Sequence, residues 1–245
     1  MELKKKTVLV TGSSRGIGRA IALAFGRAGY NVALNASKSA AQLEETKSLL
    51  ESEAIPVLAV LADVSDYEGC KLLFAKIEET FGMVDVLVNN AGISHIGLFT
   101  DMTPAEWNHV LDVNLGSVLN CTHLAVPAMV SEKDGVILNI SSMSAIRGIP
   151  DPVNNNGIYT ATKFAINGFT ECMQKYLLKY GIRVTALCPG STATSWWTRW
   201  THSFGTDAML PVDTLADIVE LIVTSPEKVL FKQLQVLPTV EIDNF

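Results

Sequence analysis

Two side chains with complementary proton chemistry lie four positions apart in the second half of the chain. Tyr159 and Lys163 belong to the segment Y-T-A-T-K, and on a helix this spacing places both side chains on one face. A tyrosine with a pKa near ~10 is a poor acid or base at neutral pH. A neighbouring ammonium group favours the phenolate and lowers that pKa by about 1–3 units. The pair therefore predicts an acid–base centre for an alcohol or a developing alkoxide, with a chance pairing on a helix surface as the alternative.

The composition and charge of the chain argue against several partners. The chain has 245 residues, of which 48% are hydrophobic and 18% charged, and its net charge is -6. Apart from the lysines at 4–6, no long like-charge run occurs. We therefore expect no nucleic acid and no membrane surface as the main partner. We also expect a cytoplasmic protein, because no signal peptide precedes the first apolar run and no stretch approaches the ~20 apolar residues of a membrane span.

The four cysteines indicate neither a metal site nor a disulfide framework. Cys70, Cys121, Cys172 and Cys188 form no C-x-x-C pair and have no histidine at metal-ligand spacing. We expect them to be small buried apolar residues in a reducing compartment.

Apolar strand patterns alternate with amphipathic helix patterns along the whole chain. The expected strands are 7–11, 31–35, 56–61, 84–89, 135–140, 182–188 and 234–237, and the expected helices are 19–28, 40–54, 66–81, 104–130, 159–180 and 213–224. This alternation is typical of a parallel sheet covered by helices on both faces. No repeat or linker divides the chain, so we expect one doubly wound α/β domain over residues 1–245.

The unusual loops all follow strands, where open α/β sheets bind ligands. They are the glycine-rich loop after the first strand, Asp63 after the third, Asn90-Ala91-Gly92 after the fourth, Ser141-Ser142 after the fifth and Pro189-Gly190 after the sixth. Because the carboxyl ends of parallel strands meet at one edge of a sheet, we expect these loops to form one site.

The loop after the first strand has the pattern G-x-x-x-G-x-G, formed by Gly12, Gly16 and Gly18. Glycines allow a sharp turn and a close approach of the backbone to a phosphate, and the helix that follows offers free N–H groups and a positive dipole end. The loop therefore predicts a dinucleotide site.

The end of the second strand indicates which dinucleotide fits. An NAD site usually places an acid there, but the chain has Asn35-Ala36-Ser37-Lys38. Arg15 and Lys38, helped by Ser37, are candidate partners for a 2′-phosphate, so we favour NADP(H). The alternative is that both cations are merely exposed.

Together these segments resemble the short-chain dehydrogenase/reductase family. The resemblance covers about residues 5–194 and rests on T-G-x-x-x-G-I-G at 11–18, N-N-A-G at 89–92, Asn114, Ser142, Y-x-x-x-K at 159–163 and Pro189-Gly190. It implies a Rossmann-type fold with a seven-stranded parallel sheet, and hydride transfer between a nicotinamide cofactor and a carbonyl or alcohol. It also implies a homo-oligomer, tetramer or dimer, paired through the long helices near 113–130 and 157–180.

The resemblance assigns roles to four catalytic candidates. Tyr159 would be the acid–base group, and Lys163 would depress its pKa and bind the nicotinamide ribose. Ser142 would hold the substrate oxygen, with Ser141 as a competitor for that role. Asn114 would anchor a water in a proton relay, and a capping or kink residue is its alternative role.

The predicted cofactor site adds further loop residues to these groups. Asp63 and Val64 are expected to bind the adenine, and Thr194 the cofactor carboxamide. The full predicted set is Gly12, Ser14, Arg15, Gly16, Ile17, Gly18, Ser37, Lys38, Asp63, Val64, Asn90, Ala91, Gly92, Tyr159, Lys163, Pro189, Gly190 and Thr194.

Three segments bear on the substrate. The loop 143–158 is longer than is usual in the family. The excursion near 190–210 would be a substrate lid, in which Trp196, Trp197 and Trp200 either form an apolar wall or belong to a docked helix. His95 could line the substrate pocket, and no histidine is assigned to catalysis.

The leading hypothesis is an NADP(H)-dependent oxidoreductase. The front half of the chain resembles 3-oxoacyl-(acyl carrier protein) reductases, and the C-terminal end resembles NADP-dependent 3-hydroxy acid dehydrogenases. The substrate would accordingly be a 3-oxoacyl thioester or a short 3-hydroxy acid. A reductase of xenobiotic or aromatic ketones is the alternative within the enzyme class, and a non-catalytic dinucleotide sensor is the alternative outside it.

Overall fold

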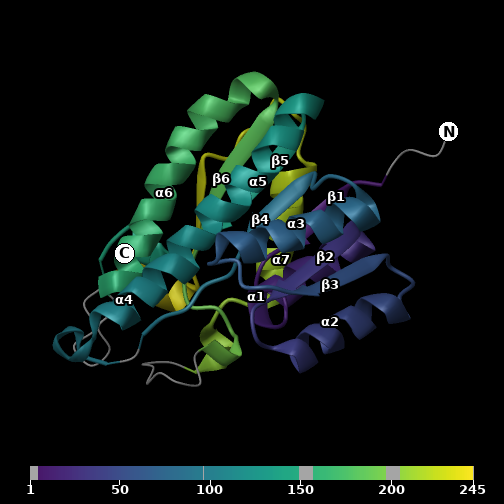
Figure 1. Ribbon diagram of the computed structural model, residues 1–245. Coiled ribbons are helices and arrows are strands. Elements are labelled where there is room, and N and C mark those ends of the chain that lie inside the picture. Colours follow the sequence, from purple (N-terminus) through teal and green to yellow (C-terminus); the bar gives the residue numbers. More distant parts are fainter. Residues whose placement is uncertain (1–4, 96, 149–156, 197–204, 245) are drawn as a thin grey trace.

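The computed structural model describes residues 5–95, 97–148, 157–196 and 205–244, and its centre is a seven-stranded parallel sheet (Figure 1). The strand order is β3-β2-β1-β4-β5-β6-β7. The strands are β1 (Thr7–Val10), β2 (Asn31–Ala36), β3 (Val57–Leu61), β4 (Val86–Asn89), β5 (Gly135–Ile140), β6 (Ile182–Pro189) and β7 (Gln233–Val236). The predicted doubly wound parallel sheet is confirmed, and so are its seven strands.

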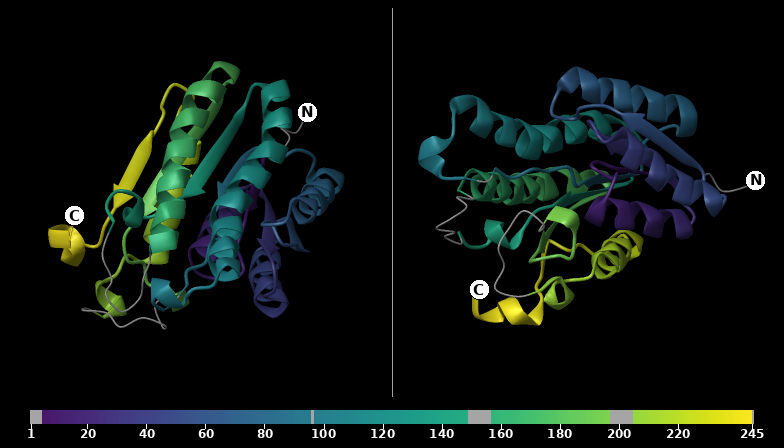
Figure 2. Two further views of the ribbon diagram at one scale, coloured as in Figure 1. Left: turned by 60° about the vertical axis from the view of Figure 1, so that its left-hand side comes forward. Right: turned by 90° about the horizontal axis from the view of Figure 1, so that it is seen from below.

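Helices cover both faces of the sheet (Figure 2). The helices are α1 (Gly16–Arg27), α2 (Ala40–Ser52), α3 (Tyr67–Phe81), α4 (Pro104–Leu111), α5 (Ser117–Glu132), α6 (Gly157–Leu177) and α7 (Val212–Thr224). Successive side chains of β1 point to opposite faces. Val8 and Val10 accordingly pack with α1, α2 and α7, whereas Leu9 packs with α3, α5 and α6. Burial on both faces explains why the central strands are continuously apolar.

The long helix expected over 104–130 is interrupted by one π-turn, Asp112–Gly116. Its predicted start is confirmed, since Thr103 and Glu106 form a capping box. Asn114 lies in the π-turn and is fully buried. Its side chain accepts a hydrogen bond from the Ile93 N–H at 2.8 Å and donates to the Ile93 carbonyl at 2.9 Å and to Thr162 Oγ1 at 3.1 Å. Asn114 therefore joins this helix to the turn after β4 and to α6.

By length and composition alone, the continuous helical stretch Pro104–Glu132 would be long and apolar enough to cross a membrane. In the fold this stretch is a core helix, because α5 packs against α3, β4 and β5.

Three of the four cysteines are buried, as expected, but Cys172 is exposed on α6. Cys70 on α3 and Cys121 on α5 place their Sγ atoms 3.5 Å apart as free thiols. Among the described residues no cluster of His, Cys, Asp and Glu is arranged to hold a metal ion.

A buried polar ladder joins β4, β5 and α6 beneath the strand ends. The Asn89 amide donates to Asn139 Oδ1 at 2.8 Å, and the Asn139 amide donates to Thr170 Oγ1 at 2.8 Å. Thr170 in turn donates to the Ile166 carbonyl at 2.7 Å. The ladder fixes α6, which carries Tyr159 and Lys163, against the sheet.

We expect Asn139→Leu to lower the free energy of unfolding by about 2–4 kcal/mol, because it leaves buried polar atoms on Asn89 and Thr170 without their partner. Urea unfolding measures the change. Gln235→Leu, on an exposed position of the edge strand β7, is the matched control and should change stability by less than ~0.5 kcal/mol. A stable Asn139→Leu variant would show that the ladder does not support the sheet.

Candidate active site

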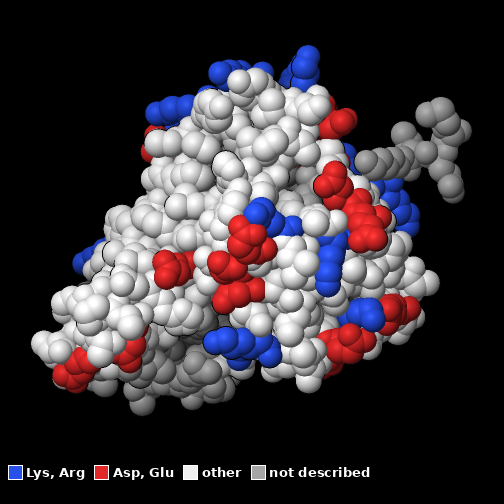
Figure 3. All heavy atoms as spheres, viewed as in Figure 1, with Lys and Arg blue, Asp and Glu red and all other residues white. Residues whose placement is uncertain are grey.

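A cavity of about 530 Å³ lies at the carboxyl ends of the strands. Every residue predicted for the cofactor site lines it, and so do Ser142, Tyr159 and Lys163. Asn114 is the exception among the predicted site residues, because it is fully buried behind the wall. Acidic and basic side chains are interspersed on the face shown in Figure 3, which hollows at its lower edge.

The glycine-rich loop has the backbone conformation that its glycines allow. Gly12 and Gly16 have φ values of +64° and +57°, a region that favours glycine. A Cβ at Gly18 would lie 2.5 Å from the Gly12 carbonyl and from the Asn90 amide. Helix α1 starts at Gly16, earlier than predicted, and no side chain caps its first turn. Its N–H groups can therefore bind an anion.

The turn Asn90-Ala91-Gly92 holds this loop in place. Asn90 Nδ2 donates to the Thr11 carbonyl at 2.9 Å and to the Gly12 carbonyl at 3.1 Å. Thr11 Oγ1 accepts from the N–H groups of Asn90 and Ala91 at 3.0 and 3.1 Å. The Asn90 side chain is thus used to position the loop.

Basic groups border the cavity near the end of β2. Arg15, Ser37 and Lys38 all line it, and no acidic residue follows β2 before α2. Arg15 Nη1 also donates to Ser195 Oγ at 3.1 Å. The Asn35 amide is instead buried between β2 and β3, where it donates to the Val60 and Ala62 carbonyls.

Tyr159, Lys163 and Ser142 meet at the other part of the cavity. Lys163 Nζ donates to the Ile140 carbonyl at 2.8 Å and lies 5.5 Å from the centroid of the Tyr159 ring. The Ser142 side chain hydrogen-bonds Tyr159 and accepts from the Ser144 N–H at 3.1 Å. Ser141 Oγ donates to the Lys163 carbonyl instead. Ser142, rather than its competitor Ser141, therefore faces the phenol.

Burial controls the proton affinity of both groups. It raises the pKa of Tyr159 above its ordinary value, and the hydrogen bond with Ser142 opposes this rise. Burial also lowers the pKa of Lys163 to about 8. The predicted net lowering of the Tyr159 pKa by Lys163 is therefore wrong for this structure. Desolvation penalises the phenolate and the ammonium alike, and the ammonium binds a backbone carbonyl.

Sequence reasoning missed several residues of the cavity wall. His109 on α4 lines the cavity, whereas His95 does not. Trp196, one of the three tryptophans that the sequence offered as a substrate wall, also lines the cavity, and its ring lies 6.0 Å from that of Tyr159. Glu241 reaches the wall from Thr239–Asn244 and accepts hydrogen bonds from the Ser191 N–H and hydroxyl. No sequence motif predicts the positions of His109 and Glu241. They depend on how α4 is oriented and on the packing of Thr239–Asn244 against the cavity.

Some predicted features lie outside the described residues. They are Trp197, Trp200 and residues 149–156 of the lengthened loop.

The comparisons with known proteins agree with this fold and site. The family model for short chain dehydrogenases matches residues 6–203. The chain is 40% identical over 185 residues to the 3-oxoacyl-[acyl-carrier-protein] reductase FabG of Staphylococcus aureus strain N315, which covers 76% of this chain and 74% of that protein.

Two solved structures show bound dinucleotides. A short chain dehydrogenase from Burkholderia cenocepacia in complex with NADP matches with a TM-score of 0.84 and 29% identity, over 97% of this chain and 98% of that one. A 3-oxoacyl-[acyl-carrier protein] reductase from Brucella melitensis with bound NAD matches with a TM-score of 0.82 and 32% identity, over 95% and 89%.

The chain therefore belongs to the short-chain dehydrogenase/reductase family. The predicted family and enzyme class are confirmed, and the protein is an oxidoreductase. These neighbours, solved with NADP and with NAD, support the predicted nicotinamide cofactor.

The lowered pKa of Lys163 predicts a particular dependence of stability on pH. The folded protein releases this proton near pH 8, whereas an unfolded chain holds it to its ordinary pKa of 10.5. Between these values the unfolded state binds more protons, so the free energy of unfolding rises with pH, by about 3 kcal/mol for this group in total.

Urea unfolding of the wild type and of Lys163→Met, from pH 7.5 to 10.5, isolates the contribution of Lys163. We expect the stability of the wild type to rise relative to that of the variant across this range. Parallel stability curves would show that the ammonium is not desolvated.

Proposed function

We propose that the protein is an NADP(H)-dependent reductase of 3-oxoacyl thioesters that transfers hydride reversibly between the nicotinamide and a carbonyl or secondary alcohol. The main support for this proposal is that one cavity contains both acid–base side chains and a loop suited to bind phosphates. A hydrogen-bonded phenol, Tyr159, and a buried ammonium, Lys163, lie in one part of it, and the glycine-rich loop with its basic neighbours lines another.

The side chains suit the proton chemistry of carbonyl reduction. The bound cofactor supplies the hydride, which adds to the carbonyl carbon. Ser142 would donate a hydrogen bond to the substrate oxygen, and Tyr159 would transfer its phenolic proton to that oxygen. The raised pKa of Tyr159 keeps this proton on the phenol at neutral pH.

Lys163 would then restore the proton to Tyr159. Its pKa of about 8 leaves it largely protonated at neutral pH and able to release a proton. Asn114 would support the relay by position, because its side chain fixes Ile93 and Thr162 beside the cavity wall.

The residues around the phosphate region favour NADP(H) over NAD(H). Arg15, Ser37 and Lys38 would receive the 2′-phosphate, and an acid that would bind the ribose 2′-OH of NAD is missing at the end of β2. The pyrophosphate would lie against Gly12, Gly16, Ile17 and Gly18, the adenine beside Asp63 and Val64, and the carboxamide near Thr194.

The substrate class rests on the relatives and on the cavity. A relative covering most of the chain is a 3-oxoacyl thioester reductase. Ile93, Val113 and Met143 also line the cavity, and their apolar side chains suit an acyl chain. Reduction of aromatic ketones is a second candidate, favoured by the Trp196 ring beside Tyr159.

The remaining proposals concern assembly and location. Leu119 on α5 and Phe164 on α6 are 40% and 46% exposed. These apolar side chains support a homo-oligomer paired through both helices. A cytoplasmic location follows from the nature of the substrates and cofactor.

We expect Tyr159→Phe to lower kcat/KM for NADPH-dependent reduction of acetoacetyl thioesters by at least about 10³-fold, because it removes the phenolic proton assigned to the substrate oxygen, and Ser142→Ala by about 10²-fold. The absorbance of NADPH measures the rate, and 3-oxo acids and aromatic ketones complete the panel. Tyr176→Phe, on an exposed part of α6, is the matched control. Unimpaired turnover by Tyr159→Phe would contradict the mechanism, and turnover of aromatic ketones alone would favour the second candidate.

The cofactor preference is tested separately by direct binding. We expect NADPH to bind more tightly than NADH. Combining Arg15→Ala with Lys38→Ala should reduce the ratio of the NADH to the NADPH dissociation constant by at least about tenfold, since each substitution removes a charged partner of the 2′-phosphate. Fluorescence titration of both reduced cofactors measures the two dissociation constants. Tighter binding of NADH by the wild type would refute the role given to these cations.

A further inference from the structure

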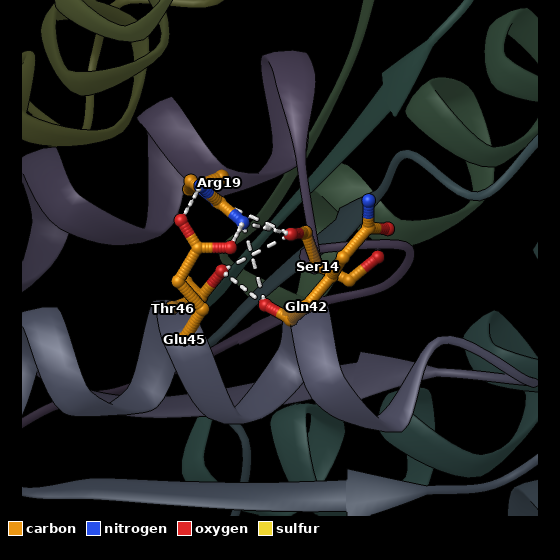
Figure 4. A network of polar contacts seen from close by, with 5 residues as sticks. All are labelled: Ser14, Arg19, Gln42, Glu45 and Thr46. Carbon is orange, nitrogen blue, oxygen red and sulfur yellow. Dashed lines mark hydrogen bonds and ion pairs between the residues drawn. The ribbon is translucent and has the colours of Figure 1, made fainter.

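The Ser14 carbonyl, in the glycine-rich loop, is held by side chains of two helices (Figure 4). Arg19 on α1 donates to it from Nε at 3.1 Å and from Nη2 at 2.7 Å. The Thr46 hydroxyl on α2 lies 3.2 Å from this carbonyl and 3.1 Å from the Gln42 carbonyl, and its one proton can go to either. The two hydrogen bonds from one guanidinium hold the plane of the Ser14 peptide.

The plane of this peptide determines where the next residue points. In a trans peptide the carbonyl and the following N–H point in opposite directions. Because the Ser14 carbonyl is drawn toward α2, the N–H of Arg15 is directed away from α2. Ser14 and Arg15 both line the cavity, so these contacts set the position of Arg15 at the phosphate region.

The same guanidinium joins this loop to α2. Arg19 forms a bidentate ion pair with Glu45, with both N–O distances 3.0 Å, and Nη2 lies 3.4 Å from the Gln42 carbonyl. The Arg19 side chain is only 22% exposed. Helix α2 begins at Ala40, two residues after Lys38, so Arg19 links the two segments that carry the proposed partners of the 2′-phosphate.

The glycine part of the loop has a separate anchor. Asn90 holds the Thr11 and Gly12 carbonyls from the turn after β4. The pyrophosphate cradle and the 2′-phosphate region are therefore fixed by different side chains.

We propose that Arg19 is a positioning residue for NADP(H) selectivity. It holds the Ser14 carbonyl and ties the glycine-rich loop to α2. Arg15 and the Ser37-Lys38 turn therefore stay at the distance from each other at which both can contact one 2′-phosphate. The inference rests on the proposed function and deepens it. Arg19 does not bind the phosphate itself, because its fork is engaged by Ser14 and Glu45.

The chain offers a matched control for this proposal. Arg27 and Glu53 form a second bidentate ion pair between α1 and α2, at 2.9 and 2.7 Å. This pair joins the far ends of the same helices and does not contact the glycine-rich loop. Arg27→Met removes a similar interaction between the helices and leaves Ser14 untouched.

Fluorescence titration of the full-length variants with NADPH and with NADH tests the proposal, and thermal unfolding without cofactor records stability. We expect Arg19→Met to weaken NADPH binding by at least about tenfold, the scale of one charge-assisted hydrogen bond, and NADH binding by less than about threefold. Arg27→Met should change neither affinity by more than about twofold. Arg19→Lys keeps the charge but loses the fork, and it should bind NADPH more weakly than the wild type.

Equal weakening of NADPH and NADH by Arg19→Met would overturn the proposal, since Arg19 would then support the loop as a whole. Wild-type NADPH affinity in Arg19→Lys would also overturn it, because charge alone would suffice. If the wild type itself binds no NADPH, the proposed function fails. If the wild type binds NADPH and Arg19→Met binds it equally well, only this inference fails.

Discussion

One buried hydrogen bond, from Lys163 Nζ to the Ile140 carbonyl, determines the geometry of the acid–base centre. It joins the last residue of β5 to the first turns of α6, so the loop that carries Ser142 and the helix that carries Tyr159 share one anchor. The anchor has an electrostatic cost, because Lys163 is only 4% exposed and its pKa falls to about 8. Burial raises the pKa of the neighbouring phenol at the same time. At neutral pH the phenol therefore keeps its proton and the amine holds a proton that it can release, which suits the proposed reduction of a carbonyl.

The rest of the fold maintains that arrangement across a parallel sheet whose strands all end at one edge. The Asn139 ladder fixes α6 from below, and Asn114 fixes it from the side through Thr162. The glycine-rich loop is held through its backbone carbonyls by Asn90 and Arg19, and through its own Ser13 hydroxyl, which accepts from the Asn35 N–H at 2.9 Å. Polar side chains that bind carbonyls position both parts of the cavity, while the apolar core holds the sheet.

Local sequence patterns were sufficient to predict the strands, the helices and the loops of the cavity. Strands and helices follow from the spacing of apolar residues, and the loops follow from glycine and other turn residues. The interruption by a π-turn at Asn114 was not predicted as such, since it follows from contacts with Ile93 and Thr162 on distant segments. His109 lines the cavity in place of His95 because the orientation of α4 depends on packing. Glu241 was missed because a contact with Ser191 across 50 positions leaves no local signal. The direction of the Tyr159 pKa shift depends on how deeply Tyr159 and Lys163 are buried. Their spacing in the sequence does not show this burial.

In the proposed complex, one cavity binds NADP(H) with its nicotinamide beside Tyr159 and its 2′-phosphate beside Arg15. A crystal structure of the protein with bound NADPH would test this arrangement. We expect the nicotinamide ring next to Tyr159 and Lys163, the pyrophosphate on the glycine-rich loop, and the 2′-phosphate in contact with Arg15 and Lys38. A dinucleotide bound in the reverse orientation, or bound elsewhere on the protein with this cavity empty, would contradict it.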